Sequence, residues 1–436
     1  MAGSLDKQAP PDRWLLITAG ALSLCGVLVN ASAGGSAAGL PRWLWQAIWA
    51  ALGLAAALLV SRLDSERLRR AAPYLYAGAL LLLVLTLVWP DAAATRRWIT
   101  LGPINIQTSE PAKATFILAA AWFLLRRDEE KLKRHGPTPI QALTVVLLAL
   151  PSLGLIAVQP DLATAFVFVP LALGLLYWAG VPGWKLAALL LIPAWALTAL
   201  IPAPEWIVEL VGPGPAASPL GALLQPWWWL GAVVMLALWL TLRKRTGVFF
   251  AWLALAGAAA GVLLPPAWNL LKEYQKRRVL MFLDPTADPK GAGYNIIQSR
   301  IAIGSGGWFG KGFQRGSQGQ LAFLPERHTD FAFSVWAEEW GYVGSAVMIL
   351  LYVFLVARMV RTASRAPDTF SSLVAYGLAV MLAFHAFFNI GMCLGVFPVA
   401  GLPLPFVSYG GSFMLTAWAA VGFCAGIERR TRSLSL

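Results

Sequence analysis

The sequence predicts an all-α polytopic membrane protein, a bundle of about twelve spanning helices. Three observations predict it. Of the 436 residues, 58% are hydrophobic and only 13% are charged, whereas a soluble domain usually carries about a quarter charged residues. Apolar runs close to the length of a membrane span recur along the chain. Basic residues gather in alternate loops, as in proteins oriented by positive cytoplasmic charge.

The apolar runs predict spans at 14–33, 42–60, 73–89, 111–125, 138–157, 162–180, 185–202, 227–242, 247–265, 333–357, 370–391 and 409–427. With the N-terminus inside and the spans alternating, most of the 34 Lys and Arg residues fall on the cytoplasmic side. No small-residue cleavage site follows the polar N-terminus, so we expect the first run to be an uncleaved span. Both termini are then expected in the cytoplasm.

The net charge of +13 would suggest nucleic acid as the partner of a soluble protein. In a membrane protein it more often reflects basic cytoplasmic loops, so no nucleic-acid partner is expected. The three cysteines lie far apart inside apolar runs, and the three histidines lack HExxH spacing. Neither a disulfide framework nor a histidine metal site is predicted.

The segment 266–330 holds no apolar run of spanning length, and the alternation places it outside, before the last three helices. Loops this long are usually functional or disordered. Its glycine pairs and apolar stretches predict a folded loop that lies against the membrane. Its basic run, Lys272, Lys276, Arg277 and Arg278, either contacts lipid or binds a polyanion, and Arg96 and Arg97 could join it.

Ionisable groups next to spans are costly, and here they favour the outer side. Glu110 and Lys113 open the fourth span three residues apart, so they can form a local ion pair, or Lys113 can contact a substrate phosphate. Asp161 opens the sixth span, and Glu338 and Glu339 lie near the outer start of the tenth.

Asp284 and Asp288 lie four residues apart in a segment rich in proline and glycine. Aspartate before proline is a common way to begin a turn. The alternative is a general base or a ligand for a divalent cation at the membrane surface.

Several motifs occur in one order along the chain. They are RWITLG at 97–102, QTSEPAK at 107–113, QPDLAT at 159–164, DPKGAGYNIIQSRIAIGSGG at 288–307, GKG at 310–312, FLPERHTD at 323–330, EEWG at 338–341 and PLPFVSYGGS at 403–412. Together they resemble the RodA branch of the SEDS family (RodA/FtsW/SpoVE), over nearly the whole chain. The isoleucine-rich stretch after Asp288 and the RHTD run favour RodA, the elongation branch, over FtsW.

The resemblance implies a SEDS fold and a peptidoglycan glycosyltransferase that polymerises lipid II on the periplasmic face of the bacterial inner membrane. It implies a cognate class B penicillin-binding protein and the MreC/MreD elongation complex as partners, beside membrane lipids. The family's essential acid corresponds to Asp288, which we interpret as the base or as the ligand of a divalent cation, Mg²⁺ or Mn²⁺. No organic cofactor is expected.

Further residues are expected to bind substrate or to shape its cavity. Lys113, Arg97 and Lys311 are candidates for pyrophosphate contact, and Asp161, Glu326, His328, Asp330 and Glu339 either order the loop or are simply buried and hydrogen-bonded. Glu110 and Ser408, from two of the motifs, complete the predicted site.

The chain departs from the family pattern in places. Thr108 stands where the motif has proline, Pro111 where leucine or isoleucine is usual, and Ala163 where glycine is usual. RodA-like chains have ten spans, and about 45 residues, 203–247, look like an inserted loop and hairpin. Such a pair preserves the side of everything downstream, so we expect a single membrane domain, 1–436, with a peripheral insertion.

Two other functions remain open from sequence. A lipid II flippase predicts a polar route across the membrane, but the cytoplasmic half of the helices holds few ionisable groups. A non-catalytic scaffold for the transpeptidase would not require Asp288 beside a cationic cluster.

Overall fold

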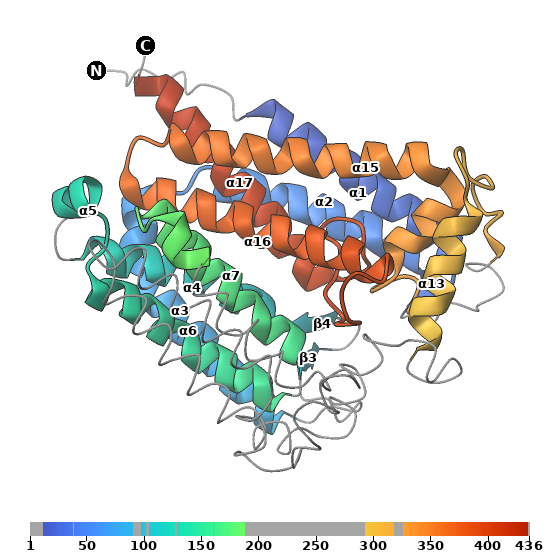
Figure 1. Cartoon of the computed structure of the whole chain (residues 1–436), viewed down its shortest axis with the longest axis horizontal. Helices are drawn as coiled ribbons and strands as arrows, with labels where there is room; N and C mark the ends of the chain where they lie inside the picture. The colour runs from blue at the N-terminus through green and yellow to red at the C-terminus, as the bar shows by residue number, and fades with distance from the viewer. Residues whose placement is uncertain are drawn as a thin grey trace, which may run out of the picture. The chain divides into compact units, whose positions relative to one another are not determined.

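The computed structural model describes residues 12–37, 39–89, 97–101, 104–126, 129–159, 161–187, 293–317 and 326–434 (Figure 1). The elements are α1 (Arg13–Ala33), β1 (Ser36–Ala37), β2 (Leu40–Pro41), α2 (Arg42–Val60), α3 (Ser65–Val88), β3 (Trp98–Leu101), β4 (Ile104–Gln107), α4 (Ser109–Leu125), α5 (Glu129–His135), α6 (Pro139–Val158), α7 (Leu162–Trp178), α13 (Tyr294–Ser305), α15 (Ala332–Ser364), α16 (Thr369–Cys393) and α17 (Gly411–Leu434). The predicted all-α bundle is confirmed. The strands form only two short antiparallel hairpins, β1–β2 and β3–β4.

Nine of the twelve predicted spans coincide with helices in the described part of the chain. The runs at 227–242 and 247–265, the insertion at 203–247, and all but the start of the run at 185–202 lie outside the described residues. The total number of spans therefore stays a prediction. The chain forms two compact units, residues 1–180 with 281–436, and residues 181–280. Only 181–187 of the second unit are described.

Helix α4 lies at the centre of the first unit and packs against α3, α6, α7, α16 and α17. Phe116, Ile117 and Leu124 on this helix are fully buried. Its buried surface includes small residues on several faces, Ala112, Ala119, Ala120 and Ala121. Apolar surface all round is typical of a helix enclosed by others.

The peripheral helices instead expose large apolar side chains. Six described helices, α1, α2, α3, α6, α15 and α16, are long and apolar enough to cross a membrane. Leu59 of α2, Leu81 of α3, Leu143 of α6 and Leu350 of α15 are each more than half exposed. Apolar side chains in that position are expected where the solvent is lipid, so the chain is a multi-pass membrane protein.

The turns gather at two opposite ends of the bundle (Figure 1). The end that holds α5, here called the α5 end, joins α3, α5 and α16 through an Arg69–Glu129 ion pair of 4.0 Å and a Thr369–Glu129 hydrogen bond. The other end, here called the α13 end, holds α13, β3–β4 and the turn at 402–410. The turns expected in the cytoplasm from basic charge lie at the α5 end, so the predicted alternation agrees with the described part of the bundle.

Helix α15 is broken at Gly341, where φ is 64° and ψ is −162°. The break frees amides and carbonyls that the loop after α13 satisfies. The amides of Tyr342 and Val343 donate to the carbonyls of Gly307 and Trp308, at 2.8 and 3.0 Å. In the other direction, the amides of residues 311 and 312 donate to the carbonyls of residues 338 and 339. The glycines of the GSGG and GKG motifs therefore join this loop to the broken helix.

We expect Gly341→Ala to lower the free energy of unfolding by roughly 2 kcal/mol or more, because the backbone conformation there is nearly restricted to glycine. A Cβ at this position would lie 2.3 Å from the amide nitrogen of Gly310. Thermal unfolding in detergent measures the loss. Gly304→Ala in α13 is the matched control, since a Cβ there meets nothing within 4 Å. Equal melting temperatures for the two variants would contradict this account of the break.

Candidate functional site

The predicted site residues that the structure describes all lie at the α13 end. They are Arg97, Glu110, Lys113, Asp161, Lys311, Glu326, His328, Asp330, Glu339 and Ser408. Asp288, predicted as the catalytic acid, lies outside the described residues, as does the basic run at 272–278. The residues form four polar clusters rather than one.

The first cluster is buried among α4, α16 and α17. Lys113 is fully buried, and its Nζ lies 2.9 Å from a carboxylate oxygen of Glu110 and 2.9 Å from Nε2 of His385. It also lies 5.2 Å from the ring centre of Phe413. The expected Glu110–Lys113 pair is therefore present, but its ammonium group is enclosed by protein. Lys113 in this arrangement positions its neighbours.

His385 was not predicted as a site residue, although its sequence position carried a signal. It is a lone histidine inside an apolar span, and such groups usually have a specific partner. The structure gives it two, since its Nδ1 also lies 3.3 Å from the carbonyl oxygen of Pro403. This second contact connects the buried ion pair to the PLPFVSYGGS motif.

The second cluster joins strand β3 to the start of α7. Arg97 Nη1 lies 3.8 Å from a carboxylate oxygen of Asp161, and its Nε donates to the carbonyl of Gln159 at 3.0 Å. The other carboxylate oxygen of Asp161 caps α7 by accepting from the amide of Thr164. The Arg97 side chain remains 28% exposed. Arg97 can therefore contact a ligand while it keeps its contacts with Asp161 and the carbonyl of Gln159.

The third cluster lies at the break in α15. Lys311 Nζ lies 2.7 Å from Glu338 Oε1, and the Ser317 hydroxyl donates to the same oxygen at 3.0 Å. Glu339 Oε1 accepts from the Ser32 hydroxyl of α1 and from the amide of Gln314 at 3.1 Å. Lys311 keeps 30% of its side chain exposed, whereas Glu338 has none. Both glutamates thus hold the loop after α13 against the bundle.

The fourth cluster joins the RHTD run to the PLPFVSYGGS turn. The Ser408 hydroxyl donates to the Thr329 carbonyl, and the amide of Tyr409 donates to the His328 carbonyl at 2.8 Å. Asn389 on α16 bonds the Asp330 and Leu402 carbonyls, both at 2.8 Å. Ser408 therefore fixes the backbone of the loop.

His328 and Glu326 lie in the same loop. Burial is the main cause that lowers the pKa of His328, and the positive charge of Arg42 adds to it. This histidine is thus kept neutral near pH 7. Glu326 is in the left-handed region, at φ 49°, and its carboxylate accepts from the Thr329 hydroxyl at 3.1 Å. The contact stabilises the turn that Glu326 begins.

The described residues offer few ligands for a metal ion. No group of three or more His, Cys, Asp or Glu side chains that could hold a metal ion occurs among them. Glu110 and Glu338 are each paired with a lysine instead. The four described clusters therefore hold their carboxylates in ion pairs and hydrogen bonds within the protein.

The comparisons with known proteins agree with the order of the motifs. A family model described as cell cycle protein, FTSW_RODA_SPOVE, matches residues 13–211 and 223–433. The chain belongs to the FtsW/RodA/SpoVE family. The gap in the match, 212–222, lies within the predicted insertion.

Two peptidoglycan glycosyltransferases of this family are similar to this chain along most of its length. The peptidoglycan glycosyltransferase RodA of Treponema pallidum is 34% identical over 433 residues, which cover 96% of this chain and 98% of that one. The peptidoglycan glycosyltransferase MrdB of Escherichia coli is 35% identical over 389 residues, 88% of this chain and 85% of that one.

Solved structures extend the family likeness to the fold. One chain from a structure on the coordination of polymerization and crosslinking by a peptidoglycan synthase complex has a TM-score of 0.64 and 30% identity, covering 97% of this chain and 98% of that one. Thermus thermophilus RodA has a TM-score of 0.57 and 27% identity, with 96% and 97% covered. The predicted RodA-like SEDS fold is confirmed.

Proposed function

We propose that the chain polymerises lipid II into glycan strands on the periplasmic face of the bacterial inner membrane during cell elongation. The observation that carries the proposal is the match to glycosyltransferases of the family over almost the whole chain. It makes the chain a peptidoglycan glycosyltransferase. The gathering of ionisable groups at the α13 end supports chemistry on that side of the membrane.

The proposed reaction is one displacement with inversion. Lipid II carries an α-linked muramyl pyrophosphate, and the product bond is β-1,4. The acceptor 4-hydroxyl loses its proton to a base and attacks the anomeric carbon, and the lipid pyrophosphate leaves. Asp288 is proposed as that base, or as the ligand of a divalent cation at the site.

The leaving pyrophosphate needs cations. Arg97 and Lys311 are proposed to contact it, because each keeps more than a quarter of its side chain exposed at the α13 end. Lys113 is proposed to position its neighbours rather than to contact the pyrophosphate, because its ammonium group is occupied by Glu110 and His385.

The proposed partners are a cognate class B penicillin-binding protein and the MreC/MreD complex. Support comes from the peptidoglycan synthase complex that contains one similar chain and in which polymerization and crosslinking are coordinated. A transpeptidase beside the polymerase would crosslink strands as they form. The orientation with both termini in the cytoplasm is part of the same proposal.

A flippase would need polar groups along a route between the two ends of the bundle. In the described residues, the ion pairs with a buried acid are Glu110–Lys113, Arg97–Asp161 and Lys311–Glu338 at the α13 end and Asp12–Arg358 at the α5 end. The helices between these pairs bury mainly apolar side chains. This distribution favours polymerisation.

The test is a pair of assays on the same purified protein, with and without the transpeptidase. Labelled lipid II and a divalent cation are supplied in detergent for polymerisation, and lipid II in vesicles is used for translocation. Glycan strands without translocation are expected. Translocation without polymer would assign the flippase function, and neither activity from a well-folded complex would assign the scaffold function.

A further inference from the structure

A polar cavity lies at the α5 end, away from all four clusters. Its volume is about 510 Å³. Its walls come from the end of α5, from the turn that follows α7 and from the first turns of α16. The proposed glycan chemistry does not use it.

Two glycines form the part of the wall where the turn after α5 meets the turn after α7. Gly136 and Gly180 have φ of 72° and 107°, and a Cβ on Gly136 would lie 3.1 Å from the carbonyl oxygen of Gly180. The two turns thus meet backbone to backbone. Leu132, 4% exposed, anchors α5 beside them. The end of α5 is therefore fixed against α7.

The opposite wall is aromatic and hydrogen-bonded. Trp178 Nε1 donates to the Ser372 hydroxyl at 2.8 Å, and that hydroxyl donates to the Ala363 carbonyl at 2.7 Å. The Trp178 ring stacks on Tyr376 with 4.2 Å between centres. Tryptophan and tyrosine are enriched at membrane interfaces, at the level of the headgroups. This wall thus marks the depth at which a headgroup lies.

Three successive residues of α5, Lys133, Arg134 and His135, line the cavity, and the first two carry positive charge. Two have acidic partners on the surface of α5, Lys133 with Glu129 at 3.1 Å and Arg134 with Glu130 at 3.8 Å. Ion pairs this exposed are weak, and each cation keeps donors for another anion.

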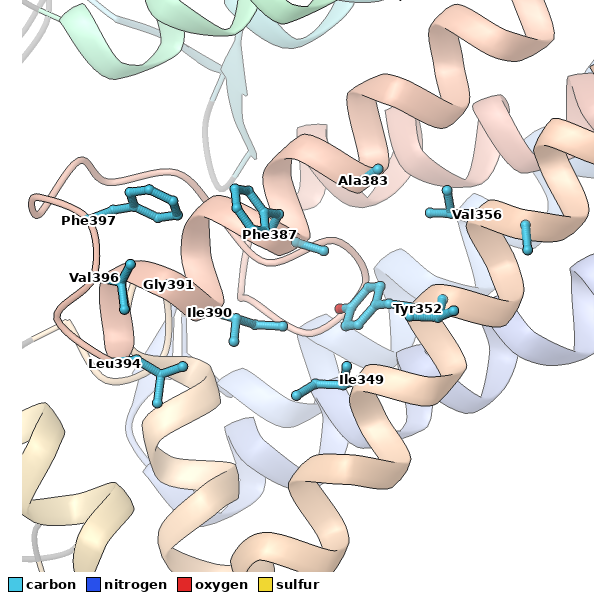
Figure 2. A pocket seen from close by; sticks show the side chains of 13 residues that line it. Ile349, Tyr352, Val356, Ala383, Phe387, Ile390, Gly391, Leu394, Val396 and Phe397 are labelled. Atoms are coloured by element: carbon cyan, nitrogen blue, oxygen red, sulfur yellow. The ribbon is translucent and has the colours of Figure 1, made fainter. Parts of the chain in front are cut away.

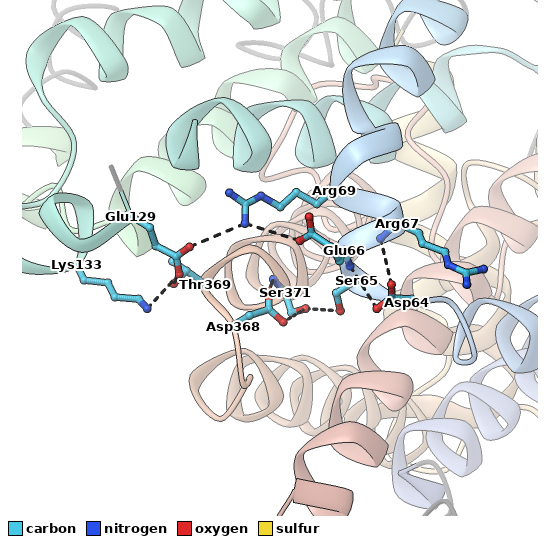
Figure 3. Close-up of polar contacts among 10 residues, drawn as sticks. All are labelled: Asp64, Ser65, Glu66, Arg67, Arg69, Glu129, Lys133, Asp368, Thr369 and Ser371. Carbon is cyan, nitrogen blue, oxygen red and sulfur yellow. Dashed lines mark hydrogen bonds and ion pairs between the residues drawn. The ribbon is translucent and has the colours of Figure 1, made fainter. Parts of the chain in front are cut away.

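The negative charge of Glu129 is shared between two cations, Arg69 and Lys133. Its carboxylate accepts from Thr369 at 2.6 Å and also lies near Arg69 and Lys133 (Figure 3). The Thr369 hydrogen bond is the main cause that lowers the pKa of Glu129. Asp368, at the start of α16, accepts from the amide and the hydroxyl of Ser371. Glu129 is thus balanced by two cations, and Asp368 is hydrogen-bonded within the first turn of α16.

We propose that this cavity binds the phosphate headgroup of an anionic phospholipid, from the leaflet at the α5 end. Basic pockets between spanning helices on the cytoplasmic side suit such headgroups. Exposed apolar side chains on the adjoining helices, Ile140 of α6 and Tyr177 of α7, offer surface for acyl chains. A bound lipid would tie α5, α7 and α16 together through one phosphate.

The described part of the chain also has an apolar groove. Its volume is about 560 Å³, and it lies between α15 and α16, lined by Tyr352 and Phe387 among others (Figure 2). Nothing in the structure shows what covers it. The basic cavity, in contrast, carries the charge that specifies its ligand.

The test uses the full-length protein in neutral detergent. Native mass spectrometry and thermal unfolding are recorded with phosphatidylglycerol, with phosphatidylcholine and with inorganic phosphate. Saturable binding of phosphatidylglycerol and a raised melting temperature are expected, with little effect of the other two. Equal stabilisation by inorganic phosphate would replace the lipid by a free anion, and equal binding of phosphatidylcholine would overturn the headgroup site.

Variants on α5 separate a built site from general positive charge. Arg134→Gln removes a cation that lines the cavity, and Lys131→Gln removes one exposed cation of the same helix that does not. Arg134→Gln should weaken phosphatidylglycerol binding about fivefold, and Lys131→Gln much less. Equal weakening by both variants would overturn the proposal, and unchanged melting temperatures without lipid show that folding is intact.

Discussion

Replacing Asp288 with alanine is expected to lower glycan polymerisation by at least about a hundredfold, the usual contribution of a general base. Four of the six acids described at the α13 end are held by partners, and the other two, Glu326 and Asp330, belong to the same large loop as Asp288. Glu110 and Glu338 are paired with lysines, Asp161 lies beside Arg97, and Glu339 accepts two hydrogen bonds. A carboxylate held in this way is poorly placed to take a proton from a sugar. The base is therefore sought in the loop that carries Asp288.

Polymer length from labelled lipid II measures the loss, with the melting temperature as the check on folding. Asp284→Ala is the matched control, because it removes an acid four residues earlier, outside the motif that begins at 288. We expect this control to keep most of its activity. An Asp288→Ala protein that still polymerises lipid II would remove the residue from the mechanism, and equal losses in both variants would point to the charge of the loop.

The spans could be predicted because their signal is length and composition. The break in α15 could not be predicted, although the two backbone segments that meet there overlap recognised motifs. A run of apolar residues from 333 to 357 is consistent with one straight helix. The break depends on the paired backbones at residues 307–312 and 338–343, which lie about 30 residues apart in sequence. Only the glycines hinted at it, since glycine often marks a close backbone approach.

For the site, likewise, the sequence predicted which residues are present but not how deeply each is buried. Ionisable residues beside spans were predicted from cost alone, and the structure gives many of them partners. The sequence could not say which cation faces solvent. Lys113 and Lys311 both looked available for pyrophosphate, yet burial is complete for the first and partial for the second. That difference arises from the packing of α16 and α17 around α4, which no local pattern encodes.

The buried pair Glu110–Lys113 gives the second large effect, on stability. Lys113→Met would leave the Glu110 carboxylate in the bundle without its ammonium partner, 1% exposed. Breaking a buried ion pair by removing one partner costs about 3–5 kcal/mol, mostly because the remaining charge is uncompensated. Replacing both, as Glu110→Gln with Lys113→Met, removes that charge. We expect the double variant to be more stable than Lys113→Met alone.

Thermal unfolding of the two single variants and the double variant forms a double-mutant cycle. The exposed pair Arg134–Glu130, whose side chains are 75% and 84% exposed, is the control, and its coupling should be below about 1 kcal/mol. Additive losses for Glu110 and Lys113 would mean that neither charge depends on the other. A strong coupling, together with weakened polymerisation in the stable double variant, would instead separate the two roles of the pair. Stability would then come from neutralising the buried charges, and activity from holding His385 and the turn at Pro403 in place beneath the α13 end.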